Sequence, residues 1–148
     1  MLLTGTFIRS IDQKLRIAIP KRLREALGCA ASGALYMTPG TDGSLAIYAE
    51  GTIGGLAERL AQVSPTQQRV RDFTRLFYAR AQPVQLDRQG RVRIPAELAE
   101  LAQFGKEVVL LGVHDHVELW AAKRWEAYLA ERQSRYDEIA EAAFGGLG

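Results

Sequence analysis

Two arginines of this chain, Arg16 and Arg91, each stand four residues after an aspartate and four residues before a proline. A planar guanidinium group matches a phosphate, or O6 and N7 of a guanine in the major groove, through paired hydrogen bonds. Neighbouring cations can add contacts that position a polyanion without reading its sequence. Three such residues lie beside the arginines: Lys14, Arg88 and Arg93. These five side chains form the predicted polyanion site.

The remaining residues of the two motifs have architectural explanations. Asp12 and Asp87 are expected to cap turns, as aspartates at the start of a turn commonly do. Gly90 suits the left-handed position of a three-residue hairpin loop. Pro20 and Pro95 suit the first position of a helix, where the missing N–H would have no partner. A purely local Asp–Arg pair is worth only about 0–1 kcal/mol at an exposed site, so a ligand explains the recurring arginines better.

The elements that must carry these residues occur twice. When the chain is shifted by 75 residues, Asp12–Pro20 falls on Asp87–Pro95, and Asp, Arg, Ile and Pro match. Each copy predicts a strand, a polar turn, a second strand, a short helix and two further strands. The expected ranges in the first copy are Arg16–Ile19, Lys21–Leu27, Leu35–Thr38 and Ser44–Ala49. Those in the second copy are Arg91–Ile94, Ala96–Ala102, Glu107–Leu111 and Val117–Trp120.

Helices are expected outside the two copies. Ile53, Leu56 and Leu60 recur at helical spacing, as do Val70, Phe73 and Phe77. Aromatic and aliphatic residues from Trp125 to Ile139 predict one long C-terminal helix that packs or forms an oligomer seam. We therefore expect an α+β protein in four parts: a first module at 5–51, connecting helices at 52–80, a second module at 81–124, and a C-terminal helix with a frayed tail at 125–148.

Composition and charge narrow the class of protein. The formal net charge is only +2, but 9–25 and 69–93 carry net charges of +4 and +5, whereas 131–141 carries −2. Two basic zones on a nearly neutral chain suggest a localised polyanion footprint, although solvated faces would also account for them. The single cysteine, Cys29, excludes an intrachain disulfide and favours the cytoplasm. No signal peptide and no apolar run of about 20 residues is apparent, so no membrane partner is expected.

Enzyme and metal chemistry find little support. His114 and His116 would lie on one face of a strand, yet they fall on a plain turn in the other copy, and zinc sites usually need three or four protein ligands. A hydrolase using Asp87 and His114 would lack a nucleophile. We find no phosphate-binding glycine loop with lysine and no Gly-x-Ser-x-Gly elbow. The sequence therefore predicts no enzyme, no metal, no cofactor and no small-molecule substrate.

The segment Asp87–Pro95 resembles the MraZ family, a branch of the AbrB-like DNA-binding proteins with tandem SpoVT/AbrB-type domains. The family signature is Asp-x-Lys-Gly-Arg followed by proline in each of two domains. The second copy keeps all but the lysine, where Gln89 stands, and the first keeps all but the glycine, where Leu15 stands. Lys106–Gly112, Val117–Trp120 and Trp125-Glu126 are also similar, so the likeness covers nearly the whole chain.

This resemblance implies a swapped-hairpin β-barrel in each domain and a ring-shaped homo-oligomer, an octamer or similar. It implies a nucleoid-associated regulator, a repressor of the division and cell-wall gene cluster, that binds promoter direct repeats in double-stranded DNA. Arg91 and Arg16 correspond to the arginines expected to reach DNA, with Lys14 beside them. An AbrB-like antitoxin whose C-terminal helix masks a protein partner is the alternative. At Leu15, either the turn has changed shape or it tolerates a left-handed strain of about 1 kcal/mol.

Overall fold

The computed structural model describes residues 2–28, 34–63 and 65–146, so Cys29 lies outside the described residues. It confirms the α+β class. The first copy contributes β1 (Thr6–Ser10), β2 (Arg16–Ala18), α1 (Lys21–Ala26), β3 (Leu35–Pro39) and β4 (Leu45–Ala49). The second copy contributes β5 (Gln82–Val84), β6 (Arg91–Arg93), α4 (Ala96–Leu101), β7 (Glu107–Val113) and β8 (His116–Ala121). The two copies thus supply the same elements in the same order.

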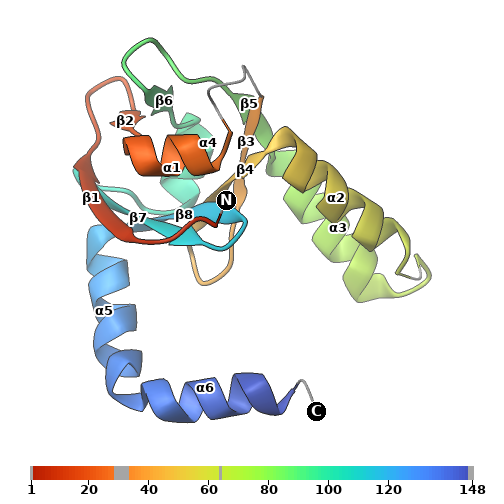
Figure 1. Ribbon diagram of the computed structural model, residues 1–148. Coiled ribbons are helices and arrows are strands. Elements are labelled where there is room, and N and C mark those ends of the chain that lie inside the picture. The colour runs from red at the N-terminus through yellow and green to blue at the C-terminus, as the bar shows by residue number, and fades with distance from the viewer. Residues whose placement is uncertain (1, 29–33, 64, 147–148) are drawn as a thin grey trace.

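The strands of one copy pair with those of the other. The six-stranded antiparallel sheet has the order β1-β7-β8-β4-β3-β5, and β2 pairs with β6 in a separate two-stranded ribbon. When each strand is replaced by its equivalent in the other copy, the result is the same strand order read from the opposite edge of the sheet. The β structure therefore has a pseudo-twofold axis. This exchange of strands between the copies fits the swapped hairpins that the family resemblance implies. The copies interlock into one body, and no closed barrel is present among the described residues (Figure 1).

One apolar core serves both copies. At the centre of the two-stranded ribbon, Ile17 lies opposite Val92, and both are fully buried. Ile19 and Ile94 follow at the next inward positions, because side chains on a strand alternate between its faces. The core also takes one leucine from each short helix, Leu23 of α1 and Leu98 of α4. Through these symmetric contacts both hairpins pack against the same hydrophobic core.

The prolines lie one residue earlier than expected. Pro20 and Pro95 are the N-caps of α1 and α4, with φ of −53° and −55°. The Pro20 carbonyl accepts the backbone N–H groups of Leu23 and Arg24, and Pro95 repeats this arrangement. Each proline thus fixes the point at which the strand of the ribbon turns into the helix.

Two helical arms project from the β structure (Figure 1). α2 (Glu50–Ala61) and α3 (Gln68–Arg80) form a hairpin, and the buried Phe77 lies on α3. The C-terminal arm differs from the single long helix that we expected. α5 (Ala122–Arg132) is followed by a 3₁₀ turn, η2 (Gln133–Arg135), and then by α6 (Tyr136–Gly145), which leaves in another direction. None of the helices in the described ranges is both long and apolar enough to cross a bilayer.

Candidate nucleic-acid interface

The first turn is organised around the carboxylate of Asp12. Its Oδ1 accepts the backbone N–H groups of Lys14 and Arg16, at 2.8 and 2.9 Å. Its Oδ2 accepts Nε of the Arg16 side chain at 2.7 Å. Because two backbone groups and one guanidinium converge on a single carboxylate, the direction in which the arginine points is fixed by the turn itself.

The second turn repeats this geometry. Oδ1 of Asp87 accepts the backbone N–H groups of Gln89 and Arg91, each at 2.9 Å. Oδ2 accepts Nε of Arg91, also at 2.9 Å. In both turns the bond to Asp uses Nε, so the guanidinium still has terminal nitrogens to offer to a ligand. The predicted local role of the aspartates therefore includes orienting the arginines.

Both turns pass through the left-handed region at the same position. Gly90 has a φ of +77° and Leu15 has a φ of +60°. The first turn has therefore kept the shape of the second and tolerates the strain, which answers the alternative that the sequence left open. Leu15 is partly buried and packs against the core, which a glycine could not do.

The two turns form a single unit. The N–H of Ile19 donates to the carbonyl of Gly90 at 2.9 Å, and the N–H of Ile94 donates to that of Leu15 at 2.7 Å. Across the same junction, a terminal nitrogen of Arg91 lies 3.9 Å from Oδ2 of Asp12. The structure thus brings together the arginines that are 75 positions apart in the sequence.

The cationic groups differ in exposure. The side chains of Arg16 and Arg91 are 30% and 29% exposed, so they are neither sequestered in the interior nor fully solvated. Lys14 and Arg88 are exposed beside them in the two turns. Arg93 is exposed on β6 and lies opposite Arg16 in the strand register. All five predicted residues therefore belong to the paired turns or to the ribbon directly behind them.

The carboxylates of the paired turns favour their charged forms. The backbone N–H of Arg16 is the largest influence that lowers the pKa of Asp12, with the Arg16 side chain adding to it. The backbone N–H and side chain of Arg91 lower the pKa of Asp87 in the same way. A hydrogen bond to the ionised form stabilises that form. The Asp–Arg pairs therefore stay ionised well below neutral pH.

Sequence reasoning missed Arg24, a further cation at this site. Its Nε donates to the carbonyl of Ile19 at 3.0 Å, and its guanidinium lies against Gly90. A Cβ built on Gly90 would come within 2.8 Å of the Arg24 guanidinium carbon. The basic zone at 9–25 contained a signal for it, but only the fold shows that this helical residue reaches the opposite turn.

His114 and His116 lie outside the paired turns, and their surroundings differ. His114 adopts a left-handed conformation in the turn between β7 and β8. His116 contacts Oδ1 of Asp115 at 2.7 Å and Oε2 of Glu118 at 3.2 Å. Within the described ranges, no group of three or more His, Cys, Asp or Glu side chains could hold a metal ion. The geometry thus concentrates the candidate chemistry in the paired turns.

Comparison with known proteins identifies the family of this chain. Residues 77–146 match the family model described as "MraZ protein, putative antitoxin-like". The chain is 39% identical over 136 residues to the transcriptional regulator MraZ of Alkaliphilus oremlandii, covering 92% of both chains. It is 37% identical to the protein of the same name from Halothermothrix orenii, covering 97% of both. The chain belongs to the MraZ family.

Membership in the MraZ family sets the class of function. The relatives are named as transcriptional regulators and not as enzymes, so the chain is a transcriptional regulator and the prediction of no enzyme is confirmed. The relative from Moorella thermoacetica is also 37% identical, and the alignment covers 93% of both chains.

Proposed function

We propose that this MraZ-family chain regulates transcription by binding double-stranded DNA through the paired turns. Arg91 and Arg16 contact base edges in the major groove, whereas Lys14, Arg88 and Arg93 contact phosphates. The observation that carries this proposal is the junction of the two turns. Each arginine is oriented by its own aspartate, and Arg91 also approaches Asp12 of the other turn.

The geometry suits a groove better than a flat anionic surface. A two-stranded ribbon or a hairpin tip is narrow enough to enter the major groove. Nε of each arginine is held by a carboxylate, so the side chain loses little further freedom when its terminal nitrogens bind a base or a phosphate. Pre-oriented donors of this kind favour readout at a fixed register over loose electrostatic attraction.

We further propose that the functional form is a homo-oligomeric ring, an octamer or similar. It would associate with the nucleoid in the cytoplasm and repress the division and cell-wall gene cluster through promoter direct repeats. One protomer presents one pair of turns, which is a small contact. Linking several such contacts makes the later binding events intramolecular, so a ring on spaced repeats would bind more tightly than one protomer.

The test is a mobility-shift titration on DNA upstream of the protein's own gene. We expect Arg91→Ala to weaken cognate binding by about 1–3 kcal/mol, because a bidentate contact to a base has this value. Arg91→Lys keeps the charge and loses the fork, so it should retain non-specific binding and lose preference for the cognate repeat. The logarithm of the binding constant should fall with that of salt concentration by about 0.9 per phosphate neutralised.

Arg59→Ala is the matched control, because it removes one exposed positive charge from α2, away from the turns. It should leave cognate binding unchanged. Equal affinity of wild type and a folded Arg91→Ala protein would contradict the assignment of Arg91.

A second candidate is an antitoxin-like role, which the description of the matching family model favours. In this case the C-terminal arm would cover a protein partner. A small protein that co-purifies at a fixed stoichiometry, and that is lost when 122–148 is deleted, would support this alternative.

A further inference from the structure

α6 is an amphipathic helix whose apolar side is bare. Tyr136, Ile139, Ala140, Ala143 and Phe144 recur at the spacing of a single helix face. Of the large side chains in this stripe, Tyr136 is 72% and Phe144 is 70% exposed. No residue described in α6 is buried, and Figure 1 shows the helix lying apart from the rest of the protomer. The stripe therefore has no cover within its own chain.

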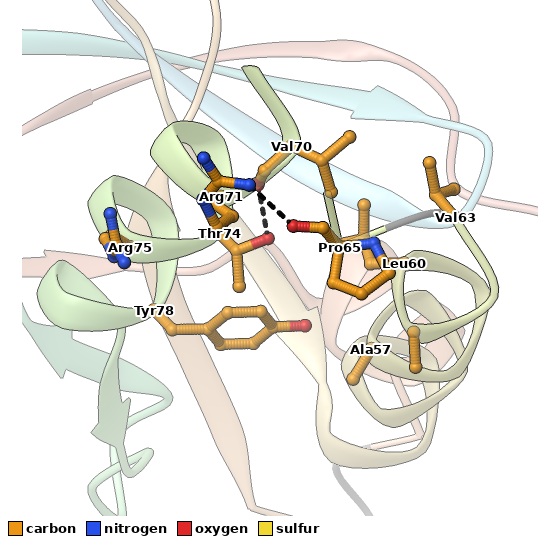
Figure 2. Close-up of a pocket in the computed structure, with 10 residues that line it drawn as sticks. Ala57, Leu60, Val63, Pro65, Val70, Arg71, Thr74, Arg75 and Tyr78 are labelled. Carbon is orange, nitrogen blue, oxygen red and sulfur yellow. Dashed lines mark hydrogen bonds between the residues drawn. The ribbon is translucent and has the colours of Figure 1, made fainter. Parts of the chain in front are cut away.

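The α2–α3 hairpin has an apolar groove of about 330 Å³. Figure 2 shows side chains of α2 and α3 facing one another across it, with the ring of Tyr78 along one side and Pro65 between the helices. An engineered apolar cavity of roughly half this volume accommodates benzene, so two large side chains of a helix could enter. The groove and the bare stripe are of similar apolar character and are well separated in the protomer.

Charge distinguishes the two surfaces in a complementary way. α3 carries four arginines against Asp72, and two of them, Arg71 and Arg75, line the groove. Arg71 is held by the Pro65 carbonyl at 2.8 Å, which fixes it at the rim. α6 carries Asp137, Glu138 and Glu141 and no basic residue, and Asp137 borders the apolar stripe. A helix lying in the groove would thus bring a net negative charge to the positively charged α3, with Asp137 nearest the guanidinium groups.

We propose that α6 of one copy of this chain docks in the α2–α3 groove of a second copy. The apolar stripe fills the groove, and Asp137 at the margin of the stripe approaches the arginines of α3. The contact joins two different surfaces, so in a joined pair one copy keeps a free groove and the other keeps a free α6 for further neighbours. The inference rests on the homo-oligomer of the proposed function and names the surfaces that join its subunits.

The experiment measures the mass of the full-length chain by light scattering after gel filtration. A helix variant, Ile139→Glu with Phe144→Glu, and a groove variant, Ala57→Glu, should each be a monomer where the wild type is an oligomer. Arg75→Glu is a second groove variant on an exposed position and should weaken association in the same direction. Ala142→Glu adds a carboxylate to α6 away from the apolar stripe, and it should associate like the wild type.

Mixing the two defective chains gives the decisive result. The helix variant still has an intact groove and the groove variant still has an intact α6, so the mixture should form a 1:1 heterodimer and grow no further. A wild-type monomer would overturn the proposal in favour of docking within one chain. Oligomers of both single variants, or a mixture that stays monomeric, would overturn it in favour of another interface.

The proposed DNA contact can be tested independently of the proposed subunit interface. The groove and helix variants leave the paired turns intact, whereas Arg91→Ala leaves α6 and the groove intact. Loss of DNA binding with an unchanged mass therefore concerns the turns. A change of mass with retained binding to a single repeat concerns the interface.

Discussion

A single carboxylate in each turn organises both the backbone and the cation that the backbone presents. One oxygen of Asp87 accepts two backbone N–H groups, and the other accepts the arginine side chain. The sequence suggested an architectural aspartate and a functional arginine as separate features. Their spacing of four residues is what allows one turn to satisfy both. The aspartate is therefore part of the presentation of the arginine and not merely a turn former.

Position 90 shows the difference between what spacing can predict and what it cannot. The left-handed turn at Gly90 was predicted from its residue type, and the fold confirms it. At the equivalent position in the first copy, Leu15, the sequence allows either a turn of different shape or a strained left-handed turn, because a leucine rarely adopts this conformation. Only tertiary structure resolves this, since the packing of Leu15 against the core offsets the strain of its backbone.

Gly90→Ala should lower the free energy of unfolding by about 1–2 kcal/mol, because an L-residue at positive φ carries that strain. Its Cβ would also press on the Arg24 guanidinium. Urea denaturation followed by circular dichroism measures the change. Gly105→Ala is the control, because nothing lies within 4 Å of its added Cβ. An unchanged midpoint for Gly90→Ala would show that the turn relaxes at no cost.

At the scale of elements, the strands and short helices follow the sequence closely, but the C-terminal arm does not. The apolar pattern from Trp125 to Ile139 fits one helix, yet three residues of 3₁₀ helix separate α5 from α6. A 3₁₀ turn has 3.0 residues per turn in place of 3.6, so three such residues shift the helical phase too little to disturb the pattern. Periodicity therefore cannot detect this kind of break.

β8 carries a histidine held by two carboxylates. The ring of His116 stacks on Tyr48 of β4 with centroids 5.0 Å apart. Hydrogen bonds to Glu118, and then to Asp115, raise the pKa of His116 against the opposing effect of burial. The same bonds to His116 lower the pKa values of Asp115 and Glu118. The strand thus contains a small ion network that favours the imidazolium.

Because folding raises the pKa of His116, its protonation stabilises the fold below the unfolded value of about 6.5, and this stabilisation is lost as pH rises through the folded value. The free energy of unfolding of the wild type minus that of His116→Gln should therefore fall as the pH rises above the unfolded value of about 6.5. Urea titrations at several pH values measure this difference. A difference that is constant over these pH values would rule out the network as a source of stability.

At the scale of the molecule, the repeat alone does not predict the interlocking of the copies, although the family resemblance implies swapped hairpins. The repeat predicts which strands exist, but it does not predict how they pair. Because β3 and β7 are equivalent strands of the two copies, β1 could pair with β3 of its own copy or with β7 of the other. Two nearly equivalent pairings give the same hydrophobic pattern on every strand. The choice is made by the shared core, to which Ile17 and Val92 contribute from opposite copies.

Interlocking predicts how the chain behaves when it is divided. Each half keeps one hairpin, β3–β4 or β7–β8, but its other two strands pair only with the other half. Fragments 1–80 and 81–148 should therefore be unfolded or self-associated when alone. Mixed in equal amounts, they should form a 1:1 complex with the circular dichroism spectrum of the intact chain. Gel filtration with light scattering, together with amide NMR spectra of each fragment, measures this. Two folded monomeric fragments would mean that each copy can close on itself, and the pairing of β2 with β6 would not be required for folding.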